Sequence, residues 1–313
     1  MDSTSHGQAA PPFGPRDIPA GLRAEMARIG PVWAQDVSGN IARMTEAFSA
    51  LLAQSPDDGV TCEAGIAYGP HPRQRFDLYR HPGTRPKAPA LVFVHGGAFV
   101  KGDRNKTPQI YSNVLRCMAR HGIVGINTGY RLADEAPWPE ASRDVGAVVA
   151  RVRADAGRLG IDPDRVFLMG HSAGGAHVAS YAYDRRLHPA GGPGLAGLIL
   201  VSGRVRADTA PDNPNAAKVV AYYGPSPEVH DTASAARHVT ADSVPTLVAW
   251  AEFENPLIDM HSAELVHALA QARRRSPPLV WLRGHNHTSS IAHLGTSDTM
   301  LEQAIADFID NPR

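Results

Sequence analysis

The hydrophobic pattern of this chain changes near residue 60. Before that point, Ile41, Met44, Phe48, Leu51 and Leu52 recur at spacings of three and four, which predicts an amphipathic helix. After it, apolar residues gather in short continuous runs, which are typical of strands buried on both faces of a parallel sheet. These runs occupy residues 91–94, 123–126, 166–169, 198–201, 246–249 and 279–282.

Helical stretches separate the runs, with apolar stripes at residues 145–152, 265–272 and 301–308. Two further strand-like segments, residues 61–67 and 74–79, have glycine and prolines between them and are expected to form a hairpin. Two leading strands and six later ones make eight. Because strand and helix alternate through the second part of the chain, the pattern predicts a three-layer α/β domain.

The pattern also divides the chain into three parts. Residues 1–19 are polar and proline-rich, so we expect a flexible N-terminal arm there. Residues 20–56 are expected to form N-terminal helices, and residues 57–313 the α/β domain. The helical part admits two interpretations: an ordinary helix that packs on the core, or a small cap over a substrate site.

Composition narrows the range of functions. The 31 basic and 31 acidic side chains give a formal charge of zero, which argues against nucleic acid as the main partner. The chain has no 18-residue apolar run and no hydrophobic stretch near its start, so we expect a cytoplasmic protein without a membrane partner. Its two cysteines, Cys62 and Cys117, are too few for a disulfide scaffold and are expected to be reduced thiols.

The strongest chemical signal is the segment GHSAGG at residues 170–175. An apolar run leads directly into it, and an alanine-rich helix is expected to follow. A sharp strand-to-helix turn needs small residues around its serine, because the backbone is crowded there. Such a turn would lift the Ser172 hydroxyl clear of the sheet and place it at a helix N-terminus that favours negative charge. The alternative is a glycine-rich turn without chemistry.

A second segment, HGGAF at residues 95–99, follows an apolar run in the same way. Acyl transfer needs N–H donors aimed at the oxyanion of the tetrahedral intermediate, and glycines allow a substrate carbonyl to approach the backbone closely. We therefore predict an oxyanion hole formed by the backbone N–H groups of Gly97, Ala98 and Ala173. His95 is expected to brace this loop, and an ordinary loop is the alternative.

A nucleophilic serine needs an acid and a histidine, which follow it in that order when the serine lies on a strand-to-helix turn. After the run at residues 246–249, three carboxylates compete. We choose Glu254, because it lies in the first turn of the loop before Asn255-Pro256, and rank Asp259 second and Glu252 third.

The base is expected to follow the last apolar run, where the chain reads RGHNHTS at residues 283–289. We choose His287 and expect His285 to be a structural neighbour. His285 and His287 are also spaced for metal binding, but the nearby sequence offers no clear third ligand, so we predict no metal.

Together these segments resemble the α/β-hydrolase superfamily, in particular the carboxylesterases related to hormone-sensitive lipase and to kynurenine formamidase. The resemblance extends from about residue 61 to the C-terminus. It implies an eight-stranded, mostly parallel sheet with helices on both faces and one early antiparallel strand. It also implies a Ser172–Glu254–His287 triad and no cofactor. The segments that carry it are HGGAF at 95–99, YRL at 130–132, GIDP at 160–163, GHSAGG at 170–175 and GHNH at 284–287.

Three departures from the family pattern refine this interpretation. Ala98 replaces a third glycine, and a glutamate stands where aspartate is commoner as the acid. His171 precedes the serine where lipase-like relatives often carry an acidic residue, which shifts the likeness towards the formamidase-like branch. The sequence therefore predicts a serine carboxylesterase. The alternatives are an arylformamidase-like amide hydrolase and a ligand-binding protein on a hydrolase scaffold that has lost catalysis.

The expected substrate is a small or medium apolar ester, cleaved through an acyl-enzyme, and a homodimer is left open. We predict that apolar residues near the motifs line its pocket, together with two residues of the N-terminal helices if these form a cap. They are Phe99, Tyr111, Trp138, Phe253, Leu257 and Ile258, with Met44 and Phe48 from the helices.

Overall fold

The computed structural model describes residues 17–55, 58–211 and 213–312. Most of the predicted flexible arm, residues 1–16, therefore lies outside the described residues, as does part of the predicted domain boundary at 56–57. Within the described part of the chain, no helix is both long enough and apolar enough to cross a membrane.

The described residues form one mixed sheet of eight strands in the order β1-β2-β4-β3-β5-β6-β7-β8. β2 runs antiparallel to both of its neighbours, and every pairing from β4 to β8 is parallel. The prediction of a mostly parallel sheet with one early antiparallel strand is thus confirmed. The strands are β1 (Thr61–Ala67), β2 (Arg75–Arg80), β3 (Ala88–Val94), β4 (Val124–Thr128), β5 (Ile161–His171), β6 (Gly197–Val201), β7 (Thr246–Phe253) and β8 (Leu279–Asn286).

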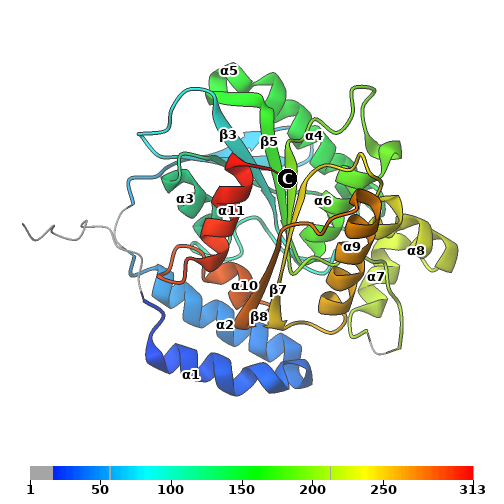
Figure 1. Ribbon diagram of the computed structural model, residues 1–313. Helices are drawn as coiled ribbons and strands as arrows, with labels where there is room; N and C mark the ends of the chain where they lie inside the picture. The colour runs from blue at the N-terminus through cyan, green and yellow to red at the C-terminus, as the bar shows by residue number, and fades with distance from the viewer. Residues whose placement is uncertain (1–16, 56–57, 212, 313) are drawn as a thin grey trace, which may run out of the picture.

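Helices cover both faces of this sheet (Figure 1). The α-helices are α1 (Ala20–Ile29), α2 (Val37–Leu52), α3 (Ser112–Arg120), α4 (Glu140–Ala154), α5 (Ala156–Leu159), α6 (Ala173–Tyr183), α7 (Ala216–Tyr223), α8 (Pro227–Ala233), α9 (Ile258–Arg273), α10 (Ser289–Ala292) and α11 (Met300–Asp310). Three short 3-10 helices join them, namely η1 (Gly30–Asp36), η2 (Arg185–Leu187) and η3 (Ala235–His238).

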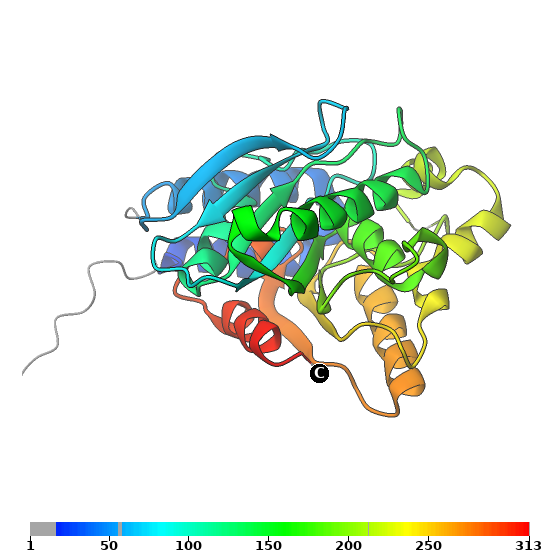
Figure 2. The same ribbon diagram turned by 90° about the horizontal axis from the view of Figure 1, so that it is seen from above.

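Alternate residues of each buried strand supply two separate cores, as the two-residue period of a strand requires. In β3, Val92 and Val94 join a core shared with α4, α6, α7 and α9, whereas Leu91 and Phe93 join a core shared with α1, α2, α3 and α11. The view from above shows the helices on either side of the strands (Figure 2). This three-layer arrangement exposes the carboxyl ends of the parallel strands at one edge, where ligands of open α/β sheets bind.

The N-terminal helices pack on the second of these cores. Pro31 interrupts the helical pattern at η1, and α2 begins after Asp36, whose carboxylate accepts a hydrogen bond from the Gly39 N–H at 2.9 Å. Met44 and Phe48 of α2 are fully buried. Residues of α1 and α2 therefore belong to the second core.

Candidate active site

Ser172 occupies the sharp turn between β5 and α6. Its backbone has φ +56° and ψ −122°, a conformation that non-glycine residues rarely adopt. Small neighbours make the turn fit: a Cβ on Gly174 would lie 2.2 Å from the Val94 carbonyl oxygen, and one on Gly170 would lie 2.5 Å from a methyl of Val178. The local sequence thus determines where the serine stands.

Ser172, His287 and Glu254 form a continuous hydrogen-bonded chain, although they come from three different strand ends. His287 Nε2 lies 3.1 Å from Ser172 Oγ, and His287 Nδ1 lies 2.6 Å from Glu254 Oε2. In the tautomer that suits both contacts, Nδ1–H donates to the carboxylate and Nε2 accepts from the hydroxyl. The side chains of His287 and Glu254 are 4% and 2% exposed, which shields their interaction from water.

Backbone donors hold the Glu254 carboxylate in place. Oε1 accepts from the N–H of Ala251 at 2.9 Å, and Oε2 accepts from the N–H of Asn255 at 3.3 Å. The His287 N–H donates to the Phe253 carbonyl at 3.0 Å, which ties the end of β8 to the end of β7. Both the imidazole and its carboxylate partner are therefore fixed before any substrate binds.

The other two candidates for the acid, Glu252 and Asp259, do not pair with His287. Glu252 is exposed and accepts a hydrogen bond from the Gly284 N–H at 2.8 Å. Asp259 is exposed in the first turn of α9. Neither has an ion pair with His287 within 4.0 Å, so the geometry favours Glu254 as the acid.

The loop after β3 lies beside the serine. A Cβ on Gly96 would lie 2.9 Å from Ser172 Cβ, and Gly97, Ala98 and Ala173 line the same cavity as Ser172. Gly97 and Ala98 have φ values of +146° and +51°. Within the described part of the chain, the N–H groups of Gly97, Ala98 and Ala173 have no hydrogen-bond acceptor. They are thus available to an oxyanion.

His95 has the bracing environment expected from the sequence. It is fully buried, its Nδ1 lies 2.7 Å from the Gly96 carbonyl oxygen, and its ring stacks on Tyr130 with centroids 4.4 Å apart. Burial lowers the pKa of His95 to about 4, so the imidazole is neutral at pH 7 and donates Nδ1–H to the loop.

His171 has a role that the sequence analysis did not assign. Its Nε2 lies 3.1 Å from the His287 carbonyl oxygen, and the two imidazole rings have centroids 4.9 Å apart. Burial and the neighbouring His287 hold the pKa of His171 well below its ordinary value. A neutral His171 therefore supports the backbone of His287. Its position directly before the serine was the one available signal.

The cavity beside Ser172 has a volume of about 360 Å³. Tyr111 lines it as predicted, and Val37, Ser38 and Ile41 of α2 form one wall. The helix that buries Met44 and Phe48 in the core thus presents its first turns to the cavity.

The other seven predicted pocket residues do not line this cavity. Met44, Phe48, Phe99 and Ile258 are at most 1% exposed and belong to the interior. The Phe253 ring packs against Gly30, Trp138 lies against Tyr223 and Arg186, and Leu257 is the N-cap of α9. The prediction failed because apolar residues near a motif are drawn into the core more strongly than into a wet pocket.

More than half of the residues that line the cavity are polar, and most of these were not among the predicted pocket residues. They include Lys101, Lys106, Arg204, Asn215 and Lys218, which come from the loop after β3, the loop after β6 and the start of α7. These residues have no common sequence motif, and only the folded chain brings them together.

Two clusters in the described residues have a composition that could hold a metal ion: Cys117, His121 and Glu302, and His285, His293 and Asp298. In each cluster the ligand atoms lie within 4.8 Å of one another. His285 Nε2 already pairs with Asp298 at 3.1 Å, and His121 Nε2 pairs with Glu302 at 2.7 Å. His287 belongs to neither cluster, so the predicted spacing of His285 and His287 does not form the metal site considered above.

Comparison with known proteins agrees with this geometry. Residues 76–289, more than half of the chain, match the BD-FAE family. The chain belongs to the BD-FAE family. The matched region begins in β2 and ends just after His287, so it contains every residue of the hydrogen-bonded chain described above.

Two curated relatives of this family member come from Mycobacterium tuberculosis. Esterase LipC is 31% identical over 202 residues, which are 58% of this chain and 49% of the relative. Esterase LipQ is 31% identical over 202 residues, which are 62% of this chain and 44% of the relative. The aligned part thus spans about half the length of these relatives.

Solved structures of similar shape show the α/β-hydrolase fold. An inhibited esterase B from Lactobacillus rhamnosis superposes with a TM-score of 0.72 at 20% identity, covering 94% of this chain and 96% of that one. A hyperthermophilic esterase from Pyrobaculum calidifontis gives 0.68 at 22% identity, covering 94% and 98%. The similarity therefore includes the N-terminal helices as well as the sheet.

Proposed function

We propose that this BD-FAE family member is a serine carboxylic-ester hydrolase with Ser172 as its nucleophile. The observation that carries the proposal is the chain Ser172–His287–Glu254, with distances of 3.1 and 2.6 Å, at a cavity that also presents three free backbone N–H groups. The names of LipC, LipQ and the two structural neighbours, all esterases, support the reaction class.

The reaction proceeds in two steps. His287 Nε2 accepts the Ser172 proton while Oγ attacks the ester carbonyl, and Glu254 stabilises the resulting imidazolium. The carbonyl oxygen becomes an oxyanion beside the N–H groups of Gly97, Ala98 and Ala173. His287 then gives the proton to the departing alcohol. Water repeats the sequence on the acyl-enzyme and releases the acid.

An oxyanion hole stabilises the transition state more than the bound ester, because the negative charge on the carbonyl oxygen develops only in the transition state. Loss of one such donor costs about 2.7–4 kcal/mol in other serine hydrolases. Backbone hydrogen bonds hold the loop after β3, from the Lys101 N–H to the Gly97 carbonyl at 3.2 Å and from the Ala133 N–H to the Phe99 carbonyl at 3.1 Å, so its N–H groups are fixed before the reaction. This preorganisation is what the loop after β3 contributes.

We prefer the hypothesis of ester hydrolysis to that of formamide hydrolysis. In the sequence, the likeness to the formamidase-like branch rested on His171. In the structure, His171 contacts the backbone of His287, and that contact serves ester and amide cleavage equally. A cavity of about 360 Å³ holds a small or medium substrate of either kind.

Hydrolysis of p-nitrophenyl acetate, butyrate and octanoate by wild type and Ser172→Ala tests the proposal. The mutant should lose at least about 1,000-fold in kcat. Ser276→Ala, an exposed serine in the loop before β8, is the control and should keep wild-type rates. Equal rates for Ser172→Ala and wild type would overturn the assignment. Faster cleavage of N-formylkynurenine than of every ester would favour the formamidase reading.

A further inference from the structure

The cavity beside Ser172 has a marked excess of positive charge. Four cationic side chains line it, Lys101, Lys106, Arg204 and Lys218, against a single carboxylate, Asp103. Asp103 lies 3.8 Å from Arg73 and is therefore already paired. The chain as a whole has zero formal charge, so this excess is local.

Arg204 is the most deeply placed of the four. It is 4% exposed, and its backbone N–H donates to the Ser172 carbonyl at 2.9 Å, which fixes it beside the serine. Its guanidinium makes one long hydrogen bond, from Nη2 to the Pro256 carbonyl at 3.4 Å. Nη1 is buried with no hydrogen-bond partner among the described residues. Asp208 and Glu254 lie near enough to favour its charge, but neither forms an ion pair with it within 4.0 Å, so a bound anion would stabilise this buried cation further.

The lysines approach the same space from other elements. Lys218 of α7 donates from Nζ to Asn215 Oδ1 at 2.9 Å, and that neutral contact leaves its charge unpaired. Lys101 and Lys106 lie on the loop after β3. Within the described residues, none of the three lysines has an ion pair within 4.0 Å. Like charges that converge without counterions repel one another, and a bound anion would relieve that repulsion.

Lys106 shows the effect of this crowding. Lys106 is an exposed residue that lines the cavity, and partial desolvation together with nearby Lys101 lowers its pKa to about 8. Both the geometry and this shift indicate a place where negative charge is missing.

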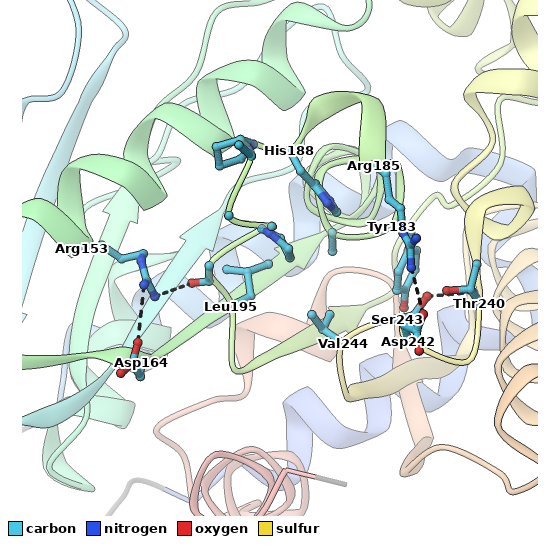
Figure 3. A pocket seen from close by; sticks show the side chains of 17 residues that line it. Arg153, Asp164, Tyr183, Arg185, His188, Leu195, Thr240, Asp242, Ser243 and Val244 are labelled. Carbon is cyan, nitrogen blue, oxygen red and sulfur yellow. Dashed lines mark hydrogen bonds and ion pairs between the residues drawn. The ribbon is translucent and has the colours of Figure 1, made fainter.

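A second pocket provides a comparison within the same molecule (Figure 3). It lies at the amino ends of β5, β6 and β7, whereas Ser172 follows the carboxyl end of β5. In it, Arg153 pairs with Asp164, and Arg185 pairs with Asp242. The two arginines of this second pocket thus have acidic partners, whereas the four cations beside Ser172 have no ion pair within 4.0 Å among the described residues.

We propose that the ester cleaved at Ser172 carries a carboxylate or a similar anionic oxygen group, bound by Arg204, Lys106 and Lys218. This inference rests on the proposed esterase function and names its substrate class. The anion lies on the acid or on the alcohol side of the ester, and it occupies the same cavity as the scissile carbonyl. The proposed substrate differs from the small or medium apolar ester expected from the sequence in having one charged end.

Two matched pairs of substrates test this inference. On the alcohol side, 3-acetoxybenzoate is compared with 3-acetoxybenzamide. On the acid side, the 4-nitrophenyl monoester of adipate is compared with the 4-nitrophenyl ester of adipamate. In at least one pair, kcat/KM for the anionic member should exceed that for the neutral member by about 10-fold or more, as charge-assisted hydrogen bonds imply.

Variants assign the preference to residues. Arg204→Gln, Lys106→Gln and Lys218→Gln should each reduce the anionic-to-neutral ratio, while the neutral member keeps most of its rate. Lys106 and Lys218 are not buried, so these two variants keep the test valid if Arg204→Gln fails to fold. Arg185→Gln, at the second pocket, is the matched control and should leave the ratio unchanged. Added salt should narrow the wild-type ratio.

Two results would overturn the inference. The first is a ratio near one in both pairs while Ser172-dependent cleavage of the neutral esters is normal, which would leave the esterase function intact. The second is a high ratio that all three cavity variants retain. Failure of the proposed function looks different, because then Ser172→Ala would cleave the neutral esters as fast as wild type.

Discussion

Trp33 Nε1 donates a hydrogen bond of 2.8 Å to Asn255 Oδ1, a contact between residues 222 positions apart. Trp33 is 2% exposed and Asn255 is 6% exposed. Asn255 in turn donates its backbone N–H to Glu254 Oε2. The N-terminal helices are thus joined to the loop that holds the acid of the proposed triad, and this contact explains how a segment outside the sheet can affect catalysis.

Trp33→Phe removes this donor and leaves Asn255 Oδ1 buried without it. We expect a loss of about 1–3 kcal/mol in the free energy of unfolding, because an unsatisfied buried acceptor is costly. If Trp33 also positions the acid loop, kcat for p-nitrophenyl butyrate should fall several-fold while KM stays constant. Trp281→Phe, at a half-exposed tryptophan of β8, is the control. A stability loss with unchanged kcat would limit Trp33 to a structural role.

Replacement of each competing carboxylate by its amide tests the identity of the acid. Glu254→Gln removes the charge that stabilises the His287 imidazolium, so kcat should fall by about 10⁴-fold, as in other triads. Glu252→Gln and Asp259→Asn should keep kcat within a factor of about two or three. Steady-state kinetics on one ester suffices for all three, with circular dichroism to verify folding. A larger loss for Asp259→Asn than for Glu254→Gln would contradict the assignment.

The oxyanion loop can be tested at Gly97. A Cβ there would lie 1.7 Å from the Lys101 carbonyl oxygen, at a φ of +146° that other residues avoid. Gly97→Ala should therefore displace the loop and lower kcat by about 100- to 1,000-fold, the range found for loss of an oxyanion donor. Gly191→Ala, with open space around its Cβ, is the control. Unchanged kcat in Gly97→Ala would show that this backbone segment does not bind the oxyanion.

Three buried histidines should make the fold sensitive to acid. Burial lowers the pKa of His95 and His293 to about 4 and that of His177 to about 3, from an ordinary value of 6.5. Between pH 6.5 and about 4, these histidines are protonated in the unfolded chain but remain neutral in the folded protein. Each therefore contributes a stability loss of about 1.4 kcal/mol per pH unit as pH falls through this window.

His177→Leu isolates one of these contributions. Both ring nitrogens of His177 are buried without hydrogen-bond partners in the described part of the chain, so an apolar side chain of similar volume suits the site. Between pH 7 and pH 5, urea unfolding should show a loss of stability smaller than that of wild type by about 2 kcal/mol, because the 1.4 kcal/mol per unit applies only below pH 6.5. An unchanged loss would mean that His177 titrates normally in the folded protein.

The fold could be predicted well from the sequence because its signals are local. Continuous apolar runs such as residues 166–169 are sufficient to indicate strands buried on both faces. The order of residues in the candidate site was also accessible, since a serine on a strand-to-helix turn restricts where the acid and the histidine follow. Ser172, His287 and Glu254 meet in the structure as their spacing suggested.

The pocket could not be predicted, because its lining is set by long-range packing. Phe99 lies in a promising motif, yet its ring stacks on Tyr222 with centroids 5.0 Å apart and is 1% exposed. Arg204 and Lys218 have no motif at all, and they reach the cavity only because the loop after β6 and α7 fold over the strand ends. The sequence identifies the reacting groups far better than the groups that select the substrate.

The most direct test of the central claim is the mass of the protein after reaction with a 4-nitrophenyl alkylphosphonate. We expect one phosphonyl group per chain, located by peptide mapping on Ser172, with loss of esterase activity in proportion to labelling. Ser172→Ala should remain unlabelled. Labelling of a different residue, or full activity in the protein labelled at Ser172, would show that Ser172 is not the nucleophile.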